Sequence, residues 1–378
     1  MVKQKKKRAI AIPVKTIFNE AGLNYFLKRQ QNLSRFDTPA GGTEYGLVFE
    51  DFMPKTIQKM LKLEYISRLE LSFHEASSKR EELIDLSKLV AYGMLYRQFS
   101  TDIFKIILQS DLLIRWNRAN PKQVIDEKTQ LKSSLIRKTL QGKENEIERV
   151  KKQIINEVVR DYDVVFSSPA SPEGSKRILT AKEFLDSLSP FSWFFLITYH
   201  NTRVFESIIS RTKELLVEYI HKTALPEYLA LVLIELLQKT ETENLKRAAE
   251  ELYGSTVDPV QLMAQHEKRL LLNNYVAQND MRFSQSYHFE KRLGLNGQQH
   301  RLRITIYNKE SEYRQMNELI YRKAHARTQD TSLFDYYTEN AGHSLESDLG
   351  FYYLSYLKEA CKSHGIRFDS FVNQISEG

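Results

Sequence analysis

The sequence predicts an α+β fold, in which a helical N-terminal region is followed by a C-terminal α/β sandwich. From Met53 to about Asn117, apolar residues recur at spacings of mostly three and four, which is typical of amphipathic helices. Around residues 283–308 the pattern changes to an alternation of apolar and polar residues, which indicates strands. Helices, then strands, then a helix and a strand after residue 177 favour this fold class. With 378 residues, the chain is long enough for about two or three domains of ~100–200 residues each.

Residues 1–45 are expected to form a basic tail and a linker. Five positive charges lie within the first eight residues, on Lys3, Lys5, Lys6, Lys7 and Arg8. The formal net charge is +7, so the rest of the chain carries only +2. We expect a solvated tail, with weak contact to an anionic polymer or lipid as the alternative. A nearly neutral body does not favour a nucleic-acid-binding fold.

Residues 46–166 are predicted to form a mostly helical domain. Thr101 is a candidate N-cap within its apolar-periodic part, and Pro121 ends that part. Residues 122–160 follow as a charged amphipathic stretch, which Gly142 divides into two helices. We expect a helical hairpin within one chain, and a coiled-coil contact between chains is the alternative.

The stretch "SSPASPEGSKR" at 167–177 is the predicted linker between domains. It holds two prolines, four serines and a glycine, which favour an exposed, protease-sensitive segment with a stable fragment beginning near Arg177. Connecting helices are expected at 178–224, and the last domain at 225–378. The elements expected after the linker are helices near 180–187, 201–221, 225–253, 258–278, 311–325 and 349–364, the hairpin, and a last strand at 366–372.

Cysteine and apolar content indicate a cytoplasmic protein without a transmembrane segment. Cys361 is the single cysteine, so no intrachain disulfide forms. The longest apolar runs, around 191–199 and 229–237, are too short to span a bilayer. The segment after the basic start lacks the sustained apolar run and the cleavage site of a signal peptide.

The sequence contains no pattern for a metal centre or a common catalytic motif. Nine histidines are scattered along the chain, and no pair has the spacing of a helical zinc site. Walker loops, dinucleotide fingerprints and G-x-S-x-G are absent. His200 is followed by Asn201 where a phosphoacceptor helix has an acidic residue, so we interpret it as a structural or surface histidine.

Three stretches stand in order in the last domain: "IELLQKTETENLKR", "RITIYNKE" and "HSLESDLG". Together they resemble the landmarks of the ATP-binding domain of the histidine kinase, gyrase and Hsp90 (GHKL) superfamily, most of all its stand-alone bacterial versions. The resemblance extends over residues 225–372. It implies a histidine kinase-like ATPase type of sandwich and a nucleotide site at these landmarks.

The first landmark resembles the family's N-box helix. There a glutamate is followed four residues later by an asparagine that holds Mg²⁺ against the triphosphate. Glu235 stands at the acidic position, but Lys239 stands at the metal position. A cation does not ligate Mg²⁺, which prefers oxygen donors. Asn244, Lys246 and Arg247 resemble a basic stretch at the end of that helix in the stand-alone versions.

The second landmark resembles the strand that ends in an adenine-binding aspartate, with a glycine soon after. Asn308 stands at the aspartate position and Glu310 at the glycine position. The asparagine can still accept a hydrogen bond, whereas the missing glycine removes the flexible turn beneath the base.

The third landmark resembles the glycine-rich turn that opens a phosphate-binding helix. Only Leu349 and Gly350 are kept, and earlier glycines are replaced by Glu346 and Asp348. Two carboxylates at this position repel phosphate. The site is therefore predicted to be vestigial, with Glu235, Lys239, Asn308, Glu346, Asp348 and Gly350 as its remaining positions and with no catalytic residue, metal or cofactor.

These changes lead to one leading functional hypothesis and two alternatives. The first is a non-catalytic regulatory or scaffolding protein, which uses a pseudo-ATPase domain to bind a protein partner in bacterial signalling. The second is an ATP-binding, kinase-like signalling enzyme with an unorthodox site, using ATP and Mg²⁺ and contacting phosphate through Lys239. The third is a nucleic-acid- or membrane-associated protein that acts through its basic tail.

Overall fold

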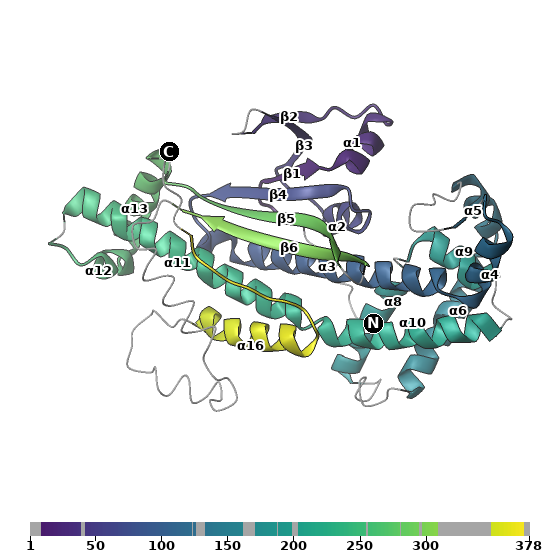
Figure 1. Ribbon diagram of the computed structural model, residues 1–378. Coiled ribbons are helices and arrows are strands. Elements are labelled where there is room, and N and C mark those ends of the chain that lie inside the picture. The colour runs from purple at the N-terminus through teal and green to yellow at the C-terminus, as the bar shows by residue number, and fades with distance from the viewer. Residues whose placement is uncertain are drawn as a thin grey trace. The chain divides into compact units, whose positions relative to one another are not determined.

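The computed structural model divides the chain into two compact units, each taken by itself below. The first unit comprises Met1–Met94 and Ala224–Gly378, and the second comprises Leu95–Thr223. The chain passes from the first to the second within helix α3 (Arg80–Leu108) and returns before α11 (Leu225–Tyr253) (Figure 1). The residues that the structure describes are 9–38, 42–122, 124–125, 133–161, 171–186, 188–198, 203–254, 256–279, 281–294, 297–308 and 349–373.

The first unit is built on a six-stranded antiparallel sheet, in the order β2-β3-β1-β4-β5-β6. The sheet joins distant parts of the sequence, because β4 pairs with β5 and Leu69 lies opposite Tyr287. The strands are β1 (Val14–Phe18), β2 (Ser34–Asp37), β3 (Thr43–Phe49), β4 (Ile66–Phe73), β5 (Phe283–Gly294) and β6 (Gly297–Tyr307).

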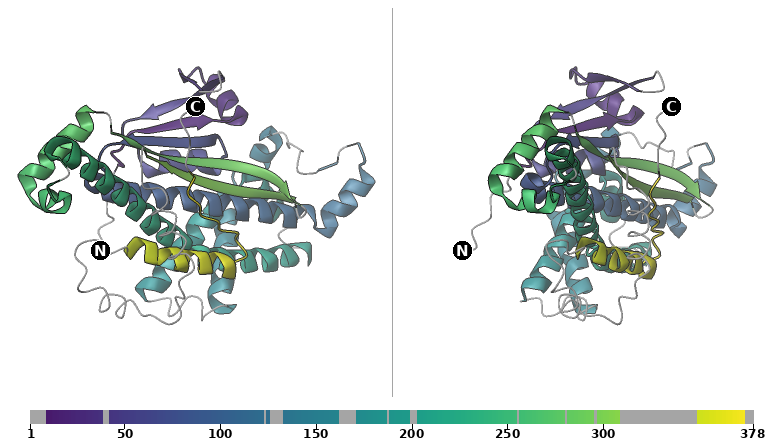
Figure 2. Two further views of the ribbon diagram at one scale, coloured as in Figure 1. Left: turned by 60° about the vertical axis from the view of Figure 1, so that its left-hand side comes forward. Right: turned by 90° about the vertical axis from the view of Figure 1, so that its left-hand side faces the viewer.

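Helices cover the apolar face of this sheet. The first part of α3 and the first half of α11 contribute Leu86, Val90 and Leu237 to one core with Leu69 and Tyr287. Figures 1 and 2 show α3 and α11 on one side of β4, β5 and β6. The other helices of the unit are α1 (Glu20–Leu27), α2 (Pro54–Lys62), the short 3-10 helix η1 (Ser77–Lys79), α12 (Pro259–Ala264), α13 (His266–Gln278) and α16 (Leu349–Ser363).

Local sequence signals explain where these helices begin. The side chain of Asn19 accepts a hydrogen bond from the Gly22 N–H and caps α1. Pro54 begins α2, where the missing N–H leaves no helical bond unmade. Asp258 caps α12 through the Val260 N–H at 2.9 Å.

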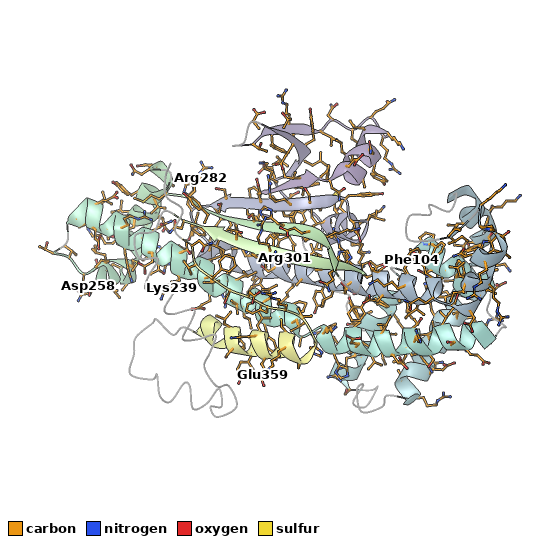
Figure 3. All side chains as sticks on the ribbon, viewed as in Figure 1. Phe104, Lys239, Asp258, Arg282, Arg301 and Glu359 are labelled. Carbon is orange, nitrogen blue, oxygen red and sulfur yellow. The ribbon has the colours of Figure 1, made fainter. Side chains whose placement is uncertain are left out.

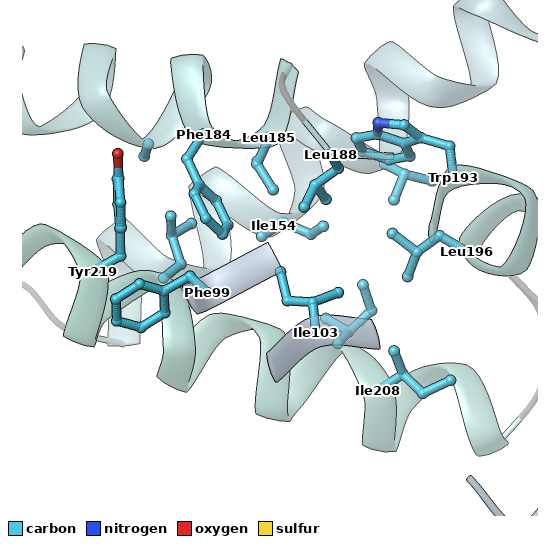
Figure 4. Packing of buried hydrophobic residues seen from close by; sticks show 14 of the residues in the cluster. Phe99, Ile103, Ile154, Phe184, Leu185, Leu188, Trp193, Leu196, Ile208 and Tyr219 are labelled. Carbon is cyan, nitrogen blue, oxygen red and sulfur yellow. The ribbon is translucent and has the colours of Figure 1, made fainter. Parts of the chain in front are cut away.

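The second unit is helical in the residues that the structure describes. Its core places Phe99 of α3 beside Phe184 and Tyr219, with ring centroids 6.4 and 5.3 Å from that of Phe99 (Figure 4). Besides the end of α3 it contains α4 (Asp111–Ala119), α5 (Ser133–Leu140), α6 (Glu144–Asp161), α8 (Pro172–Asp186), α9 (Pro190–Thr198) and α10 (Arg203–Lys222).

The α+β class and the hairpin at 283–308 are confirmed. The expectation of a tail and linker at 1–45 is wrong for its second part, which contains β1, α1, β2 and the start of β3. Within residues 46–166, β4 is a strand and not a helix. In "ISRLELSF" (Ile66–Phe73), Leu69 and Leu71 are buried two residues apart, which is the period of a strand. This strand has only eight residues and lies between two helical patterns, so its alternation was not recognised in the sequence.

The structure also divides the chain at other places than the predicted linker at 167–177. Of that linker, residues 171–177 are described, and α8 begins within it at Pro172. Phe184 of the same helix is buried in the core of the second unit, so Arg177 lies inside a packed helix. The division before Ala224 lies one residue from the expected start of the last domain, but residues 225–378 do not form a unit by themselves. They share a unit with Met1–Met94, because β5 pairs with β4 in one sheet.

The C-terminal elements agree with the prediction only in part. A helix forms at Leu349–Ser363, but residues 366–372 do not form a strand. Ile366, Phe368 and Val372 instead pack against α11 and α16 as irregular chain. The expected helix at 311–325 lies outside the described residues.

Candidate functional site

Helix α11 positions the first two predicted site residues. Leu233 and Leu237 face the core under the sheet, and Val232 packs toward α16. Glu235 and Lys239 are one helical turn apart on this helix, and both side chains are partly buried and have interaction partners. Figure 3 labels Lys239 on α11.

Helix α16 lies along α11 and carries Gly350 in its first turn. The contact is apolar and aromatic: Leu354 and Leu357 pack with α11, and the Tyr228 ring lies 6.1 Å from that of Tyr353. Figures 1 and 2 show the two helices side by side and antiparallel. The N-terminal end of α16 therefore lies toward the middle of α11, the part of that helix that carries Lys239.

The end of β6 supplies Asn308. Its neighbour Tyr307 pairs with Ser284, near the start of β5. Asn244 of α11 donates a hydrogen bond from Nδ2 to the carbonyl of Met281, just before β5, at 3.1 Å. This end of the hairpin is thus fixed to the middle of α11. The Nδ2 atom of Asn308 is buried and has no hydrogen-bond partner in the described residues.

Four of the predicted site residues lie in the first unit. α11 with Glu235 and Lys239, the end of β6 with Asn308, and the start of α16 with Gly350 belong to one unit. Glu346 and Asp348, and with them Glu310, lie outside the described residues. The described side chains offer the carboxylate of Glu235, the ammonium group of Lys239 and the amide of Asn308.

A buried carboxylate near this site was missed by the sequence analysis. Glu241 is 2% exposed, and its Oε2 accepts hydrogen bonds from the backbone N–H groups of Ala76 and Ser77 at 2.9 and 2.8 Å. The Ser77 hydroxyl donates to the same atom. The guanidinium of Arg269 lies 3.6 Å from Oε1. Glu241 stands four residues from Leu237 and Leu245, so its place on the buried stripe is the signal that could have revealed it.

The basic stretch at 244–247 has a structural role. Asn244 is fully buried, and its Oδ1 accepts a hydrogen bond from Arg247. Lys246 pairs with Glu243 at 3.0 Å. Both of these contacts lie within α11, whereas the bond from Asn244 to the Met281 carbonyl fixes this helix to the segment before β5. The charge pattern does not indicate this structural role.

The other face of the sheet carries a charged ladder. Arg68 pairs with Glu44 on β3 and with Glu70 on β4, and Glu70 also pairs with Lys15 at 2.8 Å. His288 lies between Arg68 and Arg303 in the register. Burial and these two neighbouring guanidinium groups lower the pKa of His288. The ladder is typical of a solvent-facing side of an antiparallel sheet.

The structure also bears on the expectations about metal ligands, membrane-spanning helices and Cys361. The described residues contain no group of three or more histidine, cysteine, aspartate or glutamate side chains able to hold a metal ion. Within the same residues, no helix is both long enough and apolar enough to cross a membrane. Burial raises the pKa of the Cys361 thiol to about 11, so it remains a protonated core residue. His200 and the tail at 1–8 lie outside the described residues.

A family model described as "Family of unknown function (DUF8084)" matches residues 5–378. The chain belongs to the DUF8084 family. This DUF8084 chain is also 29% identical, over 378 residues, to a protein of Treponema pallidum (strain Nichols) described as uncharacterized. The match covers 100% of this chain and 97% of that protein. No solved structure matches the chain.

Proposed function

We propose that this DUF8084 chain is a non-catalytic regulatory or scaffolding protein of bacterial signalling. In this proposal residues 225–372 carry the landmarks of a degenerate histidine kinase-like ATPase fold, and the first unit, to which they belong, serves as a protein-binding module in the cytoplasm. One observation carries it: α11 keeps its apolar side chains on the sheet and on α16, but has the ammonium group of Lys239 where the resemblance expects a Mg²⁺ ligand.

The order of the described elements supports the same proposal. A long helix, an antiparallel hairpin, and a second helix packed on the first follow each other as the resemblance leads us to expect. Glu346 and Asp348 add negative charge to the sequence just before α16. The scaffold positions are thus apolar and packed, while the positions for metal and phosphate have the wrong charge.

One observation favours a second candidate, an ATP-binding kinase-like signalling enzyme with an unorthodox site. The buried Nδ2 of Asn308 has no hydrogen-bond partner in the described residues, and buried polar groups normally have one. A bound base would supply such a partner. ATP with Mg²⁺ would then be the cofactor, and Lys239 would contact phosphate.

Repair of the site distinguishes the two candidates. We expect Lys239→Asn alone to give no Mg·ATP binding, because the acidic positions remain. Combination with Glu310→Gly, Glu346→Gly and Asp348→Gly is expected to give weak binding, measured by equilibrium dialysis.

The matched control combines the three glycine changes with Lys246→Asn, which alters a lysine on α11 away from the proposed metal position. This control is expected not to bind. Equal binding by the control and the repaired variant, or binding by the unaltered protein, would argue against a lost metal position at residue 239.

A further inference from the structure

The second unit carries a concentrated positive charge that the net charge of the chain conceals. Between residues 111 and 143 there are eight lysines and arginines and three aspartates and glutamates, a net charge of +5. Since the whole chain has +7 and the tail has +5, the remainder is left with −3. Apart from the tail, the excess positive charge of the chain is therefore located in one short stretch, which begins with α4.

The cations of α4 and of the turn after it are exposed. Arg115, Arg118 and Lys122 are exposed, and none has a side-chain hydrogen bond or ion pair in the part of the chain that the structure describes. In contrast, Lys151 of α6 contacts both Glu148 and Asp186, at 2.8 and 2.6 Å. Unneutralised cations grouped on one helix attract an anionic surface.

Apolar side chains flank these cations. Leu113 is buried and fixes the inner side of α4. At 3.6 residues per turn, Arg115 and Arg118 lie on the opposite side, with Ile114 and Trp116 to either side of them. Trp116 is 45% exposed and Ile114 is 39% exposed. A tryptophan this exposed is unusual for a residue that normally buries most of its surface.

The turn after α4 adds one more exposed apolar residue. The side chain of Asn117 donates to the carbonyl of Ile125 and accepts from its N–H, both at 2.9 Å. These two bonds hold Val124, which is 42% exposed, beside α4.

We propose that this surface, formed by Ile114, Arg115, Trp116, Arg118, Lys122 and Val124, docks the protein on an anionic phospholipid bilayer. Arginine stems reach phosphate while tryptophan lies at the headgroup level. Exposed aliphatic side chains enter the acyl boundary of a bilayer, whereas they cannot stack on the bases of a nucleic acid. A protein surface needs complementary shape, but a bilayer adapts to a single helix. The contact is peripheral, because α4 has only nine residues.

The two tryptophans make the test specific. Trp193 is 6% exposed in the core, so Trp116 is the residue whose emission reports contact with lipid. We expect the full chain to sediment with vesicles of phosphatidylcholine and phosphatidylglycerol, and not with phosphatidylcholine alone. The emission is expected to shift to shorter wavelength and to be quenched by brominated lipid, and Trp116→Phe is expected to remove both effects. High salt is expected to weaken the binding.

Paired variants locate the contact. Arg115→Gln with Arg118→Gln is expected to lower the vesicle partition constant roughly thirty-fold, because each basic residue near an anionic leaflet contributes about a factor of five. The matched control, Lys152→Gln with Arg211→Gln, removes the same charge from exposed residues of α6 and α10. Unchanged melting temperatures of both variants show that each is folded.

Several outcomes overturn the inference. It fails if the full chain does not bind anionic vesicles, if the control loses as much binding as the α4 variant, or if deletion of residues 1–8 abolishes the binding. It also fails if the protein binds a single-stranded RNA oligonucleotide but no vesicles at the same salt concentration.

Discussion

At the scale of single residues, burial distinguishes the polar residues of α11 that hold the fold from the candidate site residue Lys239. Glu241 and Asn244 are buried polar residues that fix other segments to this helix. Lys239 is only partly buried and stands where the resemblance expects a metal ligand. The sequence pattern identified Glu235, Lys239 and Asn308 as candidates, because they align with family landmarks. It did not identify Glu241, because its partners on residues 76 and 77 are about 165 positions away.

Glu241→Ala is expected to lower the free energy of unfolding by about 2–4 kcal/mol. The substitution leaves the buried N–H groups of Ala76 and Ser77 without an acceptor, and an unsatisfied buried donor costs about 1–3 kcal/mol. Urea unfolding of the full chain measures the change. Glu250→Ala, at an exposed position of the same helix, is the control and is expected to have little effect. Equal stability of the two variants would contradict the capping role of Glu241.

Tyr287 gives the fold a pH dependence in the alkaline range. Burial raises its pKa in the folded protein, and its hydroxyl is 2.8 Å from the Ser87 hydroxyl. The folded pKa lies above the unfolded value of about 10, so this contribution to stability is complete below pH ~10 and is lost as the pH rises further. We expect Tyr287→Phe to lower stability at neutral pH by about 1 kcal/mol and to reduce its loss above pH ~10.

Unfolding by urea at a series of alkaline pH values checks this expectation. Tyr307→Phe, at an exposed tyrosine, serves as control and is expected to leave the pH dependence unchanged. An unaltered alkaline slope in Tyr287→Phe would show that other groups cause it.

At the scale of elements, long periodic helices and the hairpin were predictable, whereas short N-terminal strands were not. α11 and β5–β6 have strong patterns of period 3.6 and period 2 over many residues. β1 and β2 have five and four residues, too few to reveal a period. β4 is longer, but its pairing with β5 depends on residues more than two hundred positions away, which no local pattern encodes.

Gly46 determines how closely β1 and β3 approach. It pairs with Ile17, and a Cβ atom at this position would lie 1.7 Å from the carbonyl oxygen of Thr16. Backbone cannot move away cheaply, so Gly46→Ala is expected to destabilise the protein by at least about 3 kcal/mol.

Thermal unfolding compares this variant with Gly42→Ala, which lies in the turn between β2 and β3. There the added Cβ would lie 3.1 Å from the side-chain oxygen of Thr38, the one contact among the described residues, and we expect a change below about 1 kcal/mol. A melting temperature of Gly46→Ala within error of the wild type would contradict the close strand approach.

At the scale of the whole molecule, the division into units could not be predicted from composition. The Pro- and Ser-rich stretch at 167–177 suggested a boundary, yet α8 begins at Pro172 because proline is favoured in the first turn of a helix. The first unit is assembled from both ends of the chain, since β4 needs β5 to complete the sheet. Neither division has the composition of a linker, because the first lies within α3 and the second lies just before α11.

Deletion of residues 1–8 is expected to leave the melting temperature within error of the full chain. Five like charges within this short tail repel each other and favour a solvated segment. Differential scanning calorimetry at low and moderate salt measures the difference. A clear loss of melting temperature would mean that the tail packs on the folded protein.

We propose that the site around α11 does not bind nucleotide, and calorimetric titration of the unaltered protein with Mg·ATP is the measurement that decides it. We expect no binding heat and no hydrolysis at concentrations that would saturate working members of the resembled superfamily. The physical reason is that Lys239 provides no oxygen ligand for Mg²⁺, and Glu346 and Asp348 repel phosphate. Micromolar binding that Asn308→Ala abolishes would contradict the account and favour an ATP-binding enzyme.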